Sequence, residues 1–189
     1  MERTERVSSA GPAVQRFRVP AGFAFGLFYL VVANPCTSLF TAGLVTAALG
    51  LVLRFWAAGH LQKHQALTVS GPYRWTRNPL YLGSFVIGLG FSLAGGEWWL
   101  VLVFLSLFAL LYFPVMAAEE GELVSGYGDR AREYIRRTPR FLPITAAAFP
   151  ASPQAFSVRQ ALRNREHHTV LGFLLILGYL LVKRSLLCG

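Results

Sequence analysis

The chain is poor in charge and in cysteine. Only 14% of its 189 residues are charged, whereas 54% are hydrophobic, a balance unlike that of an ordinary soluble domain. Its two cysteines, Cys36 and Cys188, are too few for a disulfide scaffold, and neither has metal-ligating residues beside it. The composition therefore indicates a membrane protein built as one compact unit.

Acidic residues are scarce as well. Nine Asp and Glu face eighteen Lys and Arg, which gives a net charge of +9. On a soluble protein this excess would suggest nucleic-acid binding. Here the basic residues gather between apolar stretches, at 3–18, 54–77 and 130–165, as the positive-inside bias of cytoplasmic loops predicts. We therefore expect a multi-pass protein with cytoplasmic basic loops and no nucleic-acid partner.

Several catalytic arrangements are missing from the polar segments. They contain no serine, histidine and aspartate set and no glycine-rich phosphate loop, so hydrolysis and phosphoryl transfer lack their parts. His60 and His64 are four residues apart and would share one helix face. Two histidines without a third ligand make a weak metal site, and we expect no metal.

Five apolar stretches organise the chain and predict an all-α, integral membrane bundle of about five membrane-associated helices. Some are short for a hydrocarbon core of about 30 Å, so tilting or local thinning is expected. The fourth is expected to continue as a polar helix to Arg140, and a short basic helix is expected within 145–168. The stretches are 20–33, 39–58, 80–94, 98–116 and 169–182.

Small residues and flanking charges give further expectations. Gly22 with Gly26, and the series Gly43, Thr46, Ala47 and Gly50, have the spacing that lets helices approach closely. Lys183-Arg184 lies on the outer flank of the last stretch, against the positive-inside bias, so that stretch either crosses or lies in the interface, and we favour crossing. We divide the chain into a flexible N-terminus (1–18), a membrane core (19–143) and a C-terminal loop with a final helix (144–189).

A polar segment, 70–83, interrupts the apolar stretches, and Glu119-Glu120 follows the next apolar hairpin. Polar groups at membrane depth are costly and usually functional, so we expect a bound polar molecule. With four crossings both segments lie on one face, the cytoplasmic one. Simpler roles are an aromatic belt, arginines that face lipid phosphates, and a helix start capped by Asn78 with Pro79 in the first turn.

These motifs resemble the integral membrane methyltransferases that include isoprenylcysteine carboxyl methyltransferase and the phospholipid N-methyltransferases. The resemblance covers about 54–143 and implies a helical protein that binds S-adenosylmethionine in a cytosol-facing pocket and receives a lipophilic acceptor from the bilayer. It rests on Gly71-Pro72-Tyr73, the run Arg77 to Gly83, Glu119-Glu120, Gly126-Tyr127-Gly128, Tyr134 and the run Pro139 to Pro143.

Matched position by position, the resemblance implies which residues hold S-adenosylmethionine, and it assigns no catalytic residue. One position departs from the pattern: Val115 stands where eukaryotic isoprenylcysteine enzymes carry an arginine thought to meet the acceptor carboxylate, which argues against a prenylated-protein substrate. The implied cofactor-binding residues are Gln65, Ala66, Leu67, Thr68, Tyr73, Asn78, Pro79, Leu80, Tyr81, Glu119 and Glu120.

The sequence thus predicts a methyltransferase that uses S-adenosylmethionine to modify a carboxyl, amine or thiol of a lipophilic or small acceptor. Two alternatives stay open. One is a membrane reductase of related fold, like the sterol reductases, with a nicotinamide cofactor. The other is a non-enzymatic membrane scaffold or lipid-binding subunit. The acceptor and the oligomeric state are left open.

Overall fold

The computed structural model describes residues 10–62, 66–144, 149–150 and 154–188, and within these ranges the chain is helical and contains no strand. This confirms the all-helical class that the apolar stretches predict. The elements are α1 (Ala10–Val32), α2 (Leu39–His60), the short 3-10 helix η1 (Gly71–Arg74), α3 (Pro79–Ala94), α4 (Trp98–Arg137), α5 (Val158–Arg163) and α6 (Glu166–Cys188).

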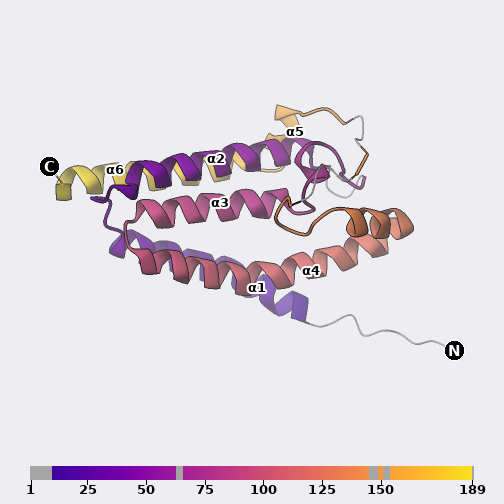
Figure 1. Ribbon diagram of the computed structural model, residues 1–189, viewed down its shortest axis with the longest axis horizontal. Coiled ribbons are helices and arrows are strands. Elements are labelled where there is room, and N and C mark those ends of the chain that lie inside the picture. Colours follow the sequence, from indigo (N-terminus) through magenta and orange to yellow (C-terminus); the bar gives the residue numbers. More distant parts are fainter. Residues whose placement is uncertain (1–9, 63–65, 145–148, 151–153, 189) are drawn as a thin grey trace.

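The long helices run side by side along the longest axis, with α2 beside α3 and with α1 and α4 below them (Figure 1). In the described part of the chain three helices, α2, α4 and α6, are long and apolar enough to cross a membrane, and Pro20–Val32 and α3 are shorter apolar helices. About five membrane-associated helices were expected; three of these helices are long enough to cross, and the other two are shorter apolar helices.

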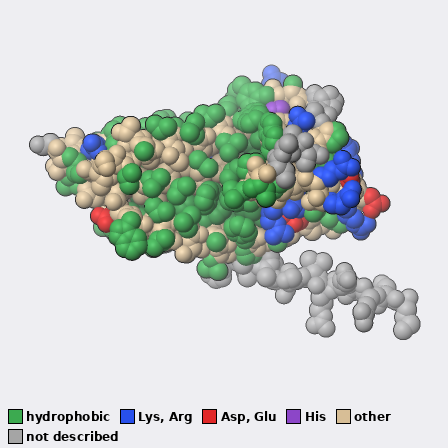
Figure 2. All heavy atoms as spheres, viewed as in Figure 1, with side chains coloured by type: hydrophobic (Ala, Val, Ile, Leu, Met, Phe, Trp, Pro, Cys, Tyr) green, Lys and Arg blue, Asp and Glu red, His purple; other side chains and the backbone are tan. Residues whose placement is uncertain are grey.

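Large apolar side chains cover the flanks of the bundle. Phe23 on α1, Leu102 on α4 and Leu174 on α6 are all more than half exposed. Figure 2 shows hydrophobic side chains along the body of the molecule, whereas Lys and Arg gather at the end that holds α5 and the last turns of α4. An apolar body with a basic end is the surface of an integral membrane protein.

The tightest helix pair is α2 with α3, which meet through small residues. A Cβ on Gly90 would lie 2.3 Å from the Ala47 backbone nitrogen, and one on Gly43 would lie 2.4 Å from that of Ala94. Gly50 makes a similar contact with Ile87. Only glycine allows such approach, so the close packing predicted for Gly43, Ala47 and Gly50 is confirmed.

The close approach predicted at Gly22 and Gly26 is wrong. A Cβ at either position would meet nothing within 4 Å, so no helix in the described part of the chain packs against these glycines. Both instead line a cavity. The spacing of small residues predicts a helix face that permits close contact. Contact is made only where a second helix lies against that face.

Several helix boundaries differ from the expected ones. Helix α1 begins at Ala10 and runs through Pro20, so it starts inside the segment predicted to be flexible. Helix α2 ends at His60, and among the described residues only η1 is helical between it and α3. Helix α4 extends past the apolar stretch as predicted and bends at Gly128, where φ is +56°, a value that favours glycine.

The basic flank of α6 binds the end of α1 and the connection that follows it. The Lys183 ammonium donates hydrogen bonds of 2.9 Å to the carbonyls of Leu30 and Val31, and Arg184 donates to the Pro35 carbonyl. The last carbonyls of a helix have no partner inside it, and cations stabilise that end. These two charges are therefore explained without a basic cytoplasmic loop.

A disulfide joins Cys36, in the α1–α2 connection, to Cys188 at the end of α6, across a sequence separation of 152 residues. Nothing in the sequence indicated this pairing, because two distant cysteines do not reveal whether they meet. The bond fastens the last helix to the rest of the bundle.

Candidate functional site

The site begins in the connection between α2 and α3. Gly71 has a φ of +54°, and a Cβ there would lie 2.4 Å from the His60 ring, so the position requires glycine. The next turn buries Tyr73, whose carbonyl accepts a hydrogen bond of 2.7 Å from the Tyr134 hydroxyl of α4. Burial raises the pKa of Tyr73 well above its usual value, so its phenol stays protonated.

The segment before α3 is tied to the segment that follows α4. The Arg77 amide donates to the Pro139 carbonyl at 2.9 Å, and the Asn78 side-chain amide donates to the Arg140 carbonyl at 2.9 Å. These contacts link two of the motifs on which the family resemblance rests, although more than sixty residues separate them.

Asn78 does not cap α3 with its side chain. Asn78 directly precedes Pro79, the first residue of α3, as predicted, but its side chain makes no hydrogen bond that caps the helix. Its amide points to Arg140. The expected capping role is therefore wrong, while the expected place of Pro79 in the first turn is confirmed.

Tyr81 and Glu119 form the contact at the centre of the site. The Tyr81 hydroxyl donates a hydrogen bond of 2.5 Å to Glu119 Oε1, which joins α3 to α4 in a partly buried position. The Tyr81 ring packs edgewise on Tyr112, with 5.5 Å between centroids. A hydrogen bond to a carboxylate is stronger than one between neutral groups, so it orients Glu119.

The neighbouring Glu120 turns to two arginines. Arg77 Nη1 lies 3.0 Å from Glu120 Oε1, and Arg140 donates from Nε and Nη2 at 2.7 and 2.8 Å. Arg77 is only 9% exposed; burial lowers its pKa and the Glu120 charge opposes that effect. Arg77 therefore faces inward to Glu120, not outward to lipid phosphates. The two adjacent carboxylates thus have separate surroundings.

The stretch predicted to run along the cofactor is only partly described, and Gln65 lies outside the described residues. Ala66 follows it, Leu67 is buried against Val69 and Tyr134, and the Thr68 hydroxyl accepts from the Gln62 amide at 3.2 Å. The Leu67 and Thr68 side chains are engaged with protein, so for these two residues the backbone is the part left to contact a ligand.

Leu80 lies in the first turn of α3, directly after the buried Pro79. The Leu80 carbonyl accepts a hydrogen bond of 2.9 Å from the Ser84 hydroxyl, one turn further along α3. Leu80 therefore continues the run of predicted residues from Asn78 to Tyr81 at the start of one helix.

His60 belongs to a polar link with the C-terminal segment. Its Nδ1 lies 3.0 Å from the Ser70 hydroxyl, which donates in turn to the Gln154 side chain at 3.2 Å. His64 lies outside the described residues. Among the residues described, no three His, Cys, Asp or Glu side chains are placed to hold a metal ion together.

Sequence reasoning missed an ion pair inside the bundle. The Arg54 guanidinium donates to both Glu166 carboxylate oxygens, at 2.9 and 3.0 Å, and also to the Ser84 hydroxyl. The charge of Arg54 therefore faces Glu166 within the bundle. The only signal in the sequence was an acid at the start of the last apolar stretch.

These features define a membrane-embedded helical bundle with a polar pair at one end. We call this pair, Tyr81 and Glu119, the clamp. The chain belongs to the phospholipid methyltransferase family, whose model matches residues 29–130, a range that contains both Tyr81 and Glu119. No solved structure matches the chain.

Three relatives of known name are similar to part of the chain. The cobalt-zinc-cadmium resistance protein CzcN of Cupriavidus metallidurans is 39% identical over 56% of this chain and 49% of its own length. The nickel-cobalt-cadmium resistance protein NccN of Alcaligenes xylosoxydans xylosoxydans is 32% identical over 56% of this chain and 50% of its own. The protein-S-isoprenylcysteine O-methyltransferase of Schizosaccharomyces pombe is 29% identical over 46% of this chain and 37% of its own length. The chain spans about half the length, or less, of the curated relatives it matches.

Proposed function

We propose that the chain is an integral membrane methyltransferase that uses S-adenosylmethionine to methylate a carboxyl, amine or thiol of a lipophilic or small acceptor. The observation that carries the proposal is the Tyr81–Glu119 hydrogen bond. It joins the two segments that the family resemblance assigns to the cofactor, and it lies inside the range that matches the family.

The residues at the clamp fit such a cofactor by their chemistry. A carboxylate such as Glu119 accepts hydrogen bonds from amino and hydroxyl groups and balances a positive charge. The Tyr81 ring, which packs edgewise on Tyr112 with 5.5 Å between centroids, is of the aromatic type whose face attracts cations. We assign Tyr73, Asn78 and the 65–68 stretch to the same site, as the resemblance implies.

S-adenosylmethionine, when bound, supplies an electrophilic methyl group. The chain needs no nucleophile of its own, because methyl transfer to an acceptor depends mainly on alignment and on exclusion of water. In this proposal Glu119 and Tyr81 hold and orient the donor. Glu120 is a positioning residue, because its ion pairs with Arg77 and Arg140 join the loops on either side of the clamp.

We further propose that the clamp faces the cytoplasm and that five segments cross the membrane. The Cys36–Cys188 bond lies at one end of the long helices and the clamp at the other. Disulfides persist in oxidising compartments outside the cytoplasm, and the basic residues gather at the clamp end (Figure 2). Of the α6 charges that oppose this orientation, Lys183 caps α1 and Arg184 bonds the connection after it.

Calorimetry on the purified full chain tests the proposed donor. We expect S-adenosylmethionine to bind and NADPH, offered under the same conditions, to give no heat above dilution. Binding of NADPH alone would favour the reductase alternative. Binding of neither would contradict the enzyme proposal.

A further inference from the structure

A cavity of about 430 Å³ lies inside the bundle, between α1 and α6 on one side and α3 and α4 on the other. This volume is in the range of small-molecule pockets, about 300–1,000 Å³. Most of the wall is apolar and includes Phe25, Gly26, Ile87, Phe104 and Ile176. A cavity with such walls suits a hydrocarbon chain.

The wall also carries a polar cluster. Arg54, Ser84, Tyr112 and Thr169 line the same cavity. The Arg54 guanidinium is paired with Glu166, which is 4% exposed, so the positive charge is already balanced. Ionisable residues inside a membrane protein are costly and usually functional. The cluster offers hydrogen bonds without an uncompensated charge.

This polar cluster adjoins the proposed methyl-donor clamp. Ser84 is on the same helix as Tyr81, one turn further along, and Tyr112 packs directly on the Tyr81 ring. A molecule with its apolar part in the cavity would therefore place its head beside Tyr81 and Glu119. Tyr112 thus connects the two features, because it lines the cavity and packs on the Tyr81 ring.

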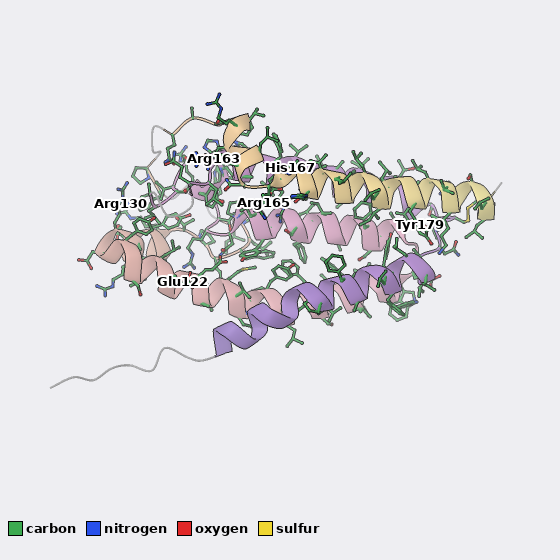
Figure 3. The ribbon with its side chains drawn as sticks, turned by 180° about the vertical axis from the view of Figure 1, so that it is seen from behind. Glu122, Arg130, Arg163, Arg165, His167 and Tyr179 are labelled. Atoms are coloured by element: carbon green, nitrogen blue, oxygen red, sulfur yellow. A yellow bond between two sulfur atoms is a disulfide. The ribbon has the colours of Figure 1, made fainter. Side chains whose placement is uncertain are left out.

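The cavity is lined by α1 and α6, two helices that diverge at one end of the bundle. Figure 3 shows α1 and α6 converging near Tyr179, where the Tyr179 hydroxyl bonds the Leu30 carbonyl at 2.7 Å, and diverging toward the end near Arg165 and His167. In that diverging half, a Cβ added to Gly22 or Gly26 would have no atom of the described residues within 4 Å. These two glycines therefore keep the cavity wide.

We infer that this cavity binds a single-chain amphiphile with an uncharged head, and that the Arg54–Glu166 pair selects that head. The inference rests on the proposed function and narrows its acceptor from a carboxyl, amine or thiol to a head that is uncharged when it binds. A carboxylate head would have to compete with Glu166 for Arg54, and Val115, where the resemblance leads one to expect an acceptor-binding arginine, is 1% exposed and apolar. The limited volume favours one chain over the two chains of a phospholipid.

Photocrosslinking tests the inference without methyl transfer. Full-length protein in nanodiscs is exposed to dodecanol or dodecanoic acid, each carrying a mid-chain diazirine, and labelled peptides are identified by mass spectrometry. We expect dodecanol to label α1 and α6 peptides at the cavity at least about fivefold more than dodecanoic acid does. Equal labelling, or preference for the acid, would overturn the inference.

Two variants separate the cavity from general membrane binding. Gly26→Leu places a side chain in open space inside the cavity and should reduce dodecanol labelling about tenfold. Gly178→Leu, at an exposed position of α6 with the same open surroundings, should leave labelling unchanged. If Gly26→Leu labels like the unmodified protein, the amphiphile does not occupy the cavity.

A third variant tests the head-group selection. Glu166→Gln removes the charge that balances Arg54, so labelling by dodecanoic acid should rise severalfold relative to dodecanol. A purely structural ion pair would lower labelling by both probes equally, which would contradict the selective role. Because labelling needs no methyl donor, the cavity inference can fail while S-adenosylmethionine still binds, and the converse also holds.

Discussion

Tyr81 on α3 donates a hydrogen bond of 2.5 Å to Glu119 on α4, which lies 38 residues further along the chain. The next residue, Glu120, bonds Arg77 and Arg140 instead. Two adjacent carboxylates therefore have different roles, because successive residues on a helix point in different directions. Glu119 faces the Tyr81 hydroxyl and is the carboxylate that we propose holds the methyl donor, whereas Glu120 connects the loops around this pair.

The Tyr81 hydroxyl orients Glu119, so Tyr81→Phe should weaken S-adenosylmethionine binding while the ring stays in place. A hydrogen bond to a charged group is worth about 1.5–3 kcal/mol, so we expect a loss of about tenfold or more in affinity. Titration calorimetry measures it. Tyr179→Phe loses a hydrogen bond at the other end of the bundle and should bind normally. An equal loss in both variants would point to general destabilisation.

Glu120→Gln should lower the stability of the folded protein. It leaves the buried Arg77 without its counter-charge, and breaking a buried pair costs up to about 3–5 kcal/mol. Thermal unfolding in detergent should show a clear drop in melting temperature. Glu133→Gln is the control, because Glu133 pairs with the more exposed Arg136 and Arg137. This variant should melt like the unmodified protein. If Glu120→Gln melts at the temperature of the unmodified protein, the ion pairs of Glu120 do not stabilise the loops.

The glycine contact between α2 and α3 predicts a third result. Gly90→Ala places a Cβ 2.3 Å from the Ala47 backbone, which cannot move without displacing a helix. We expect a destabilisation of about 1–3 kcal/mol, as for an overpacked core. A Cβ on Gly26 would meet no atom within 4 Å, so Gly26→Ala should be neutral or slightly stabilising. The pair is compared by denaturant unfolding, and similar midpoints would contradict this packing.

The proposed orientation predicts where the disulfide can be reached. In intact cells, a membrane-impermeant reductant followed by an impermeant maleimide should label both Cys36 and Cys188, and no label should appear without reduction. Cys36→Ser should leave Cys188 open to labelling with no reductant. Labelling that requires permeabilised membranes would place this end in the cytoplasm and reverse the orientation.

The predictable part of the fold was local in sequence. Apolar runs predicted the helices, and the spacing of Gly43, Ala47 and Gly50 predicted a close contact that the structure confirms. At Gly22 and Gly26 the same reasoning failed, because spacing does not reveal whether a partner is present. Helix α1 also begins earlier than its apolar run, since a polar segment can be helical.

The site was predictable only where a recognised motif covered it. Tyr81 and Glu119 could be named in advance, and the structure brings them together. The Arg54–Glu166 pair and the Cys36–Cys188 bond join residues 112 and 152 positions apart, and no periodicity links residues at such distances. Long-range pairs of this kind depend on how the helices assemble.

Glu119→Ala, compared with Glu122→Ala by titration calorimetry with S-adenosylmethionine, tests the central claim most directly. Glu122 lies less than one turn away on the same helix and is exposed (labelled in Figure 3). The account predicts that Glu119→Ala weakens binding more than tenfold, above about 1.4 kcal/mol, and that Glu122→Ala binds like the unmodified protein. Unchanged binding in a folded Glu119→Ala variant would contradict it.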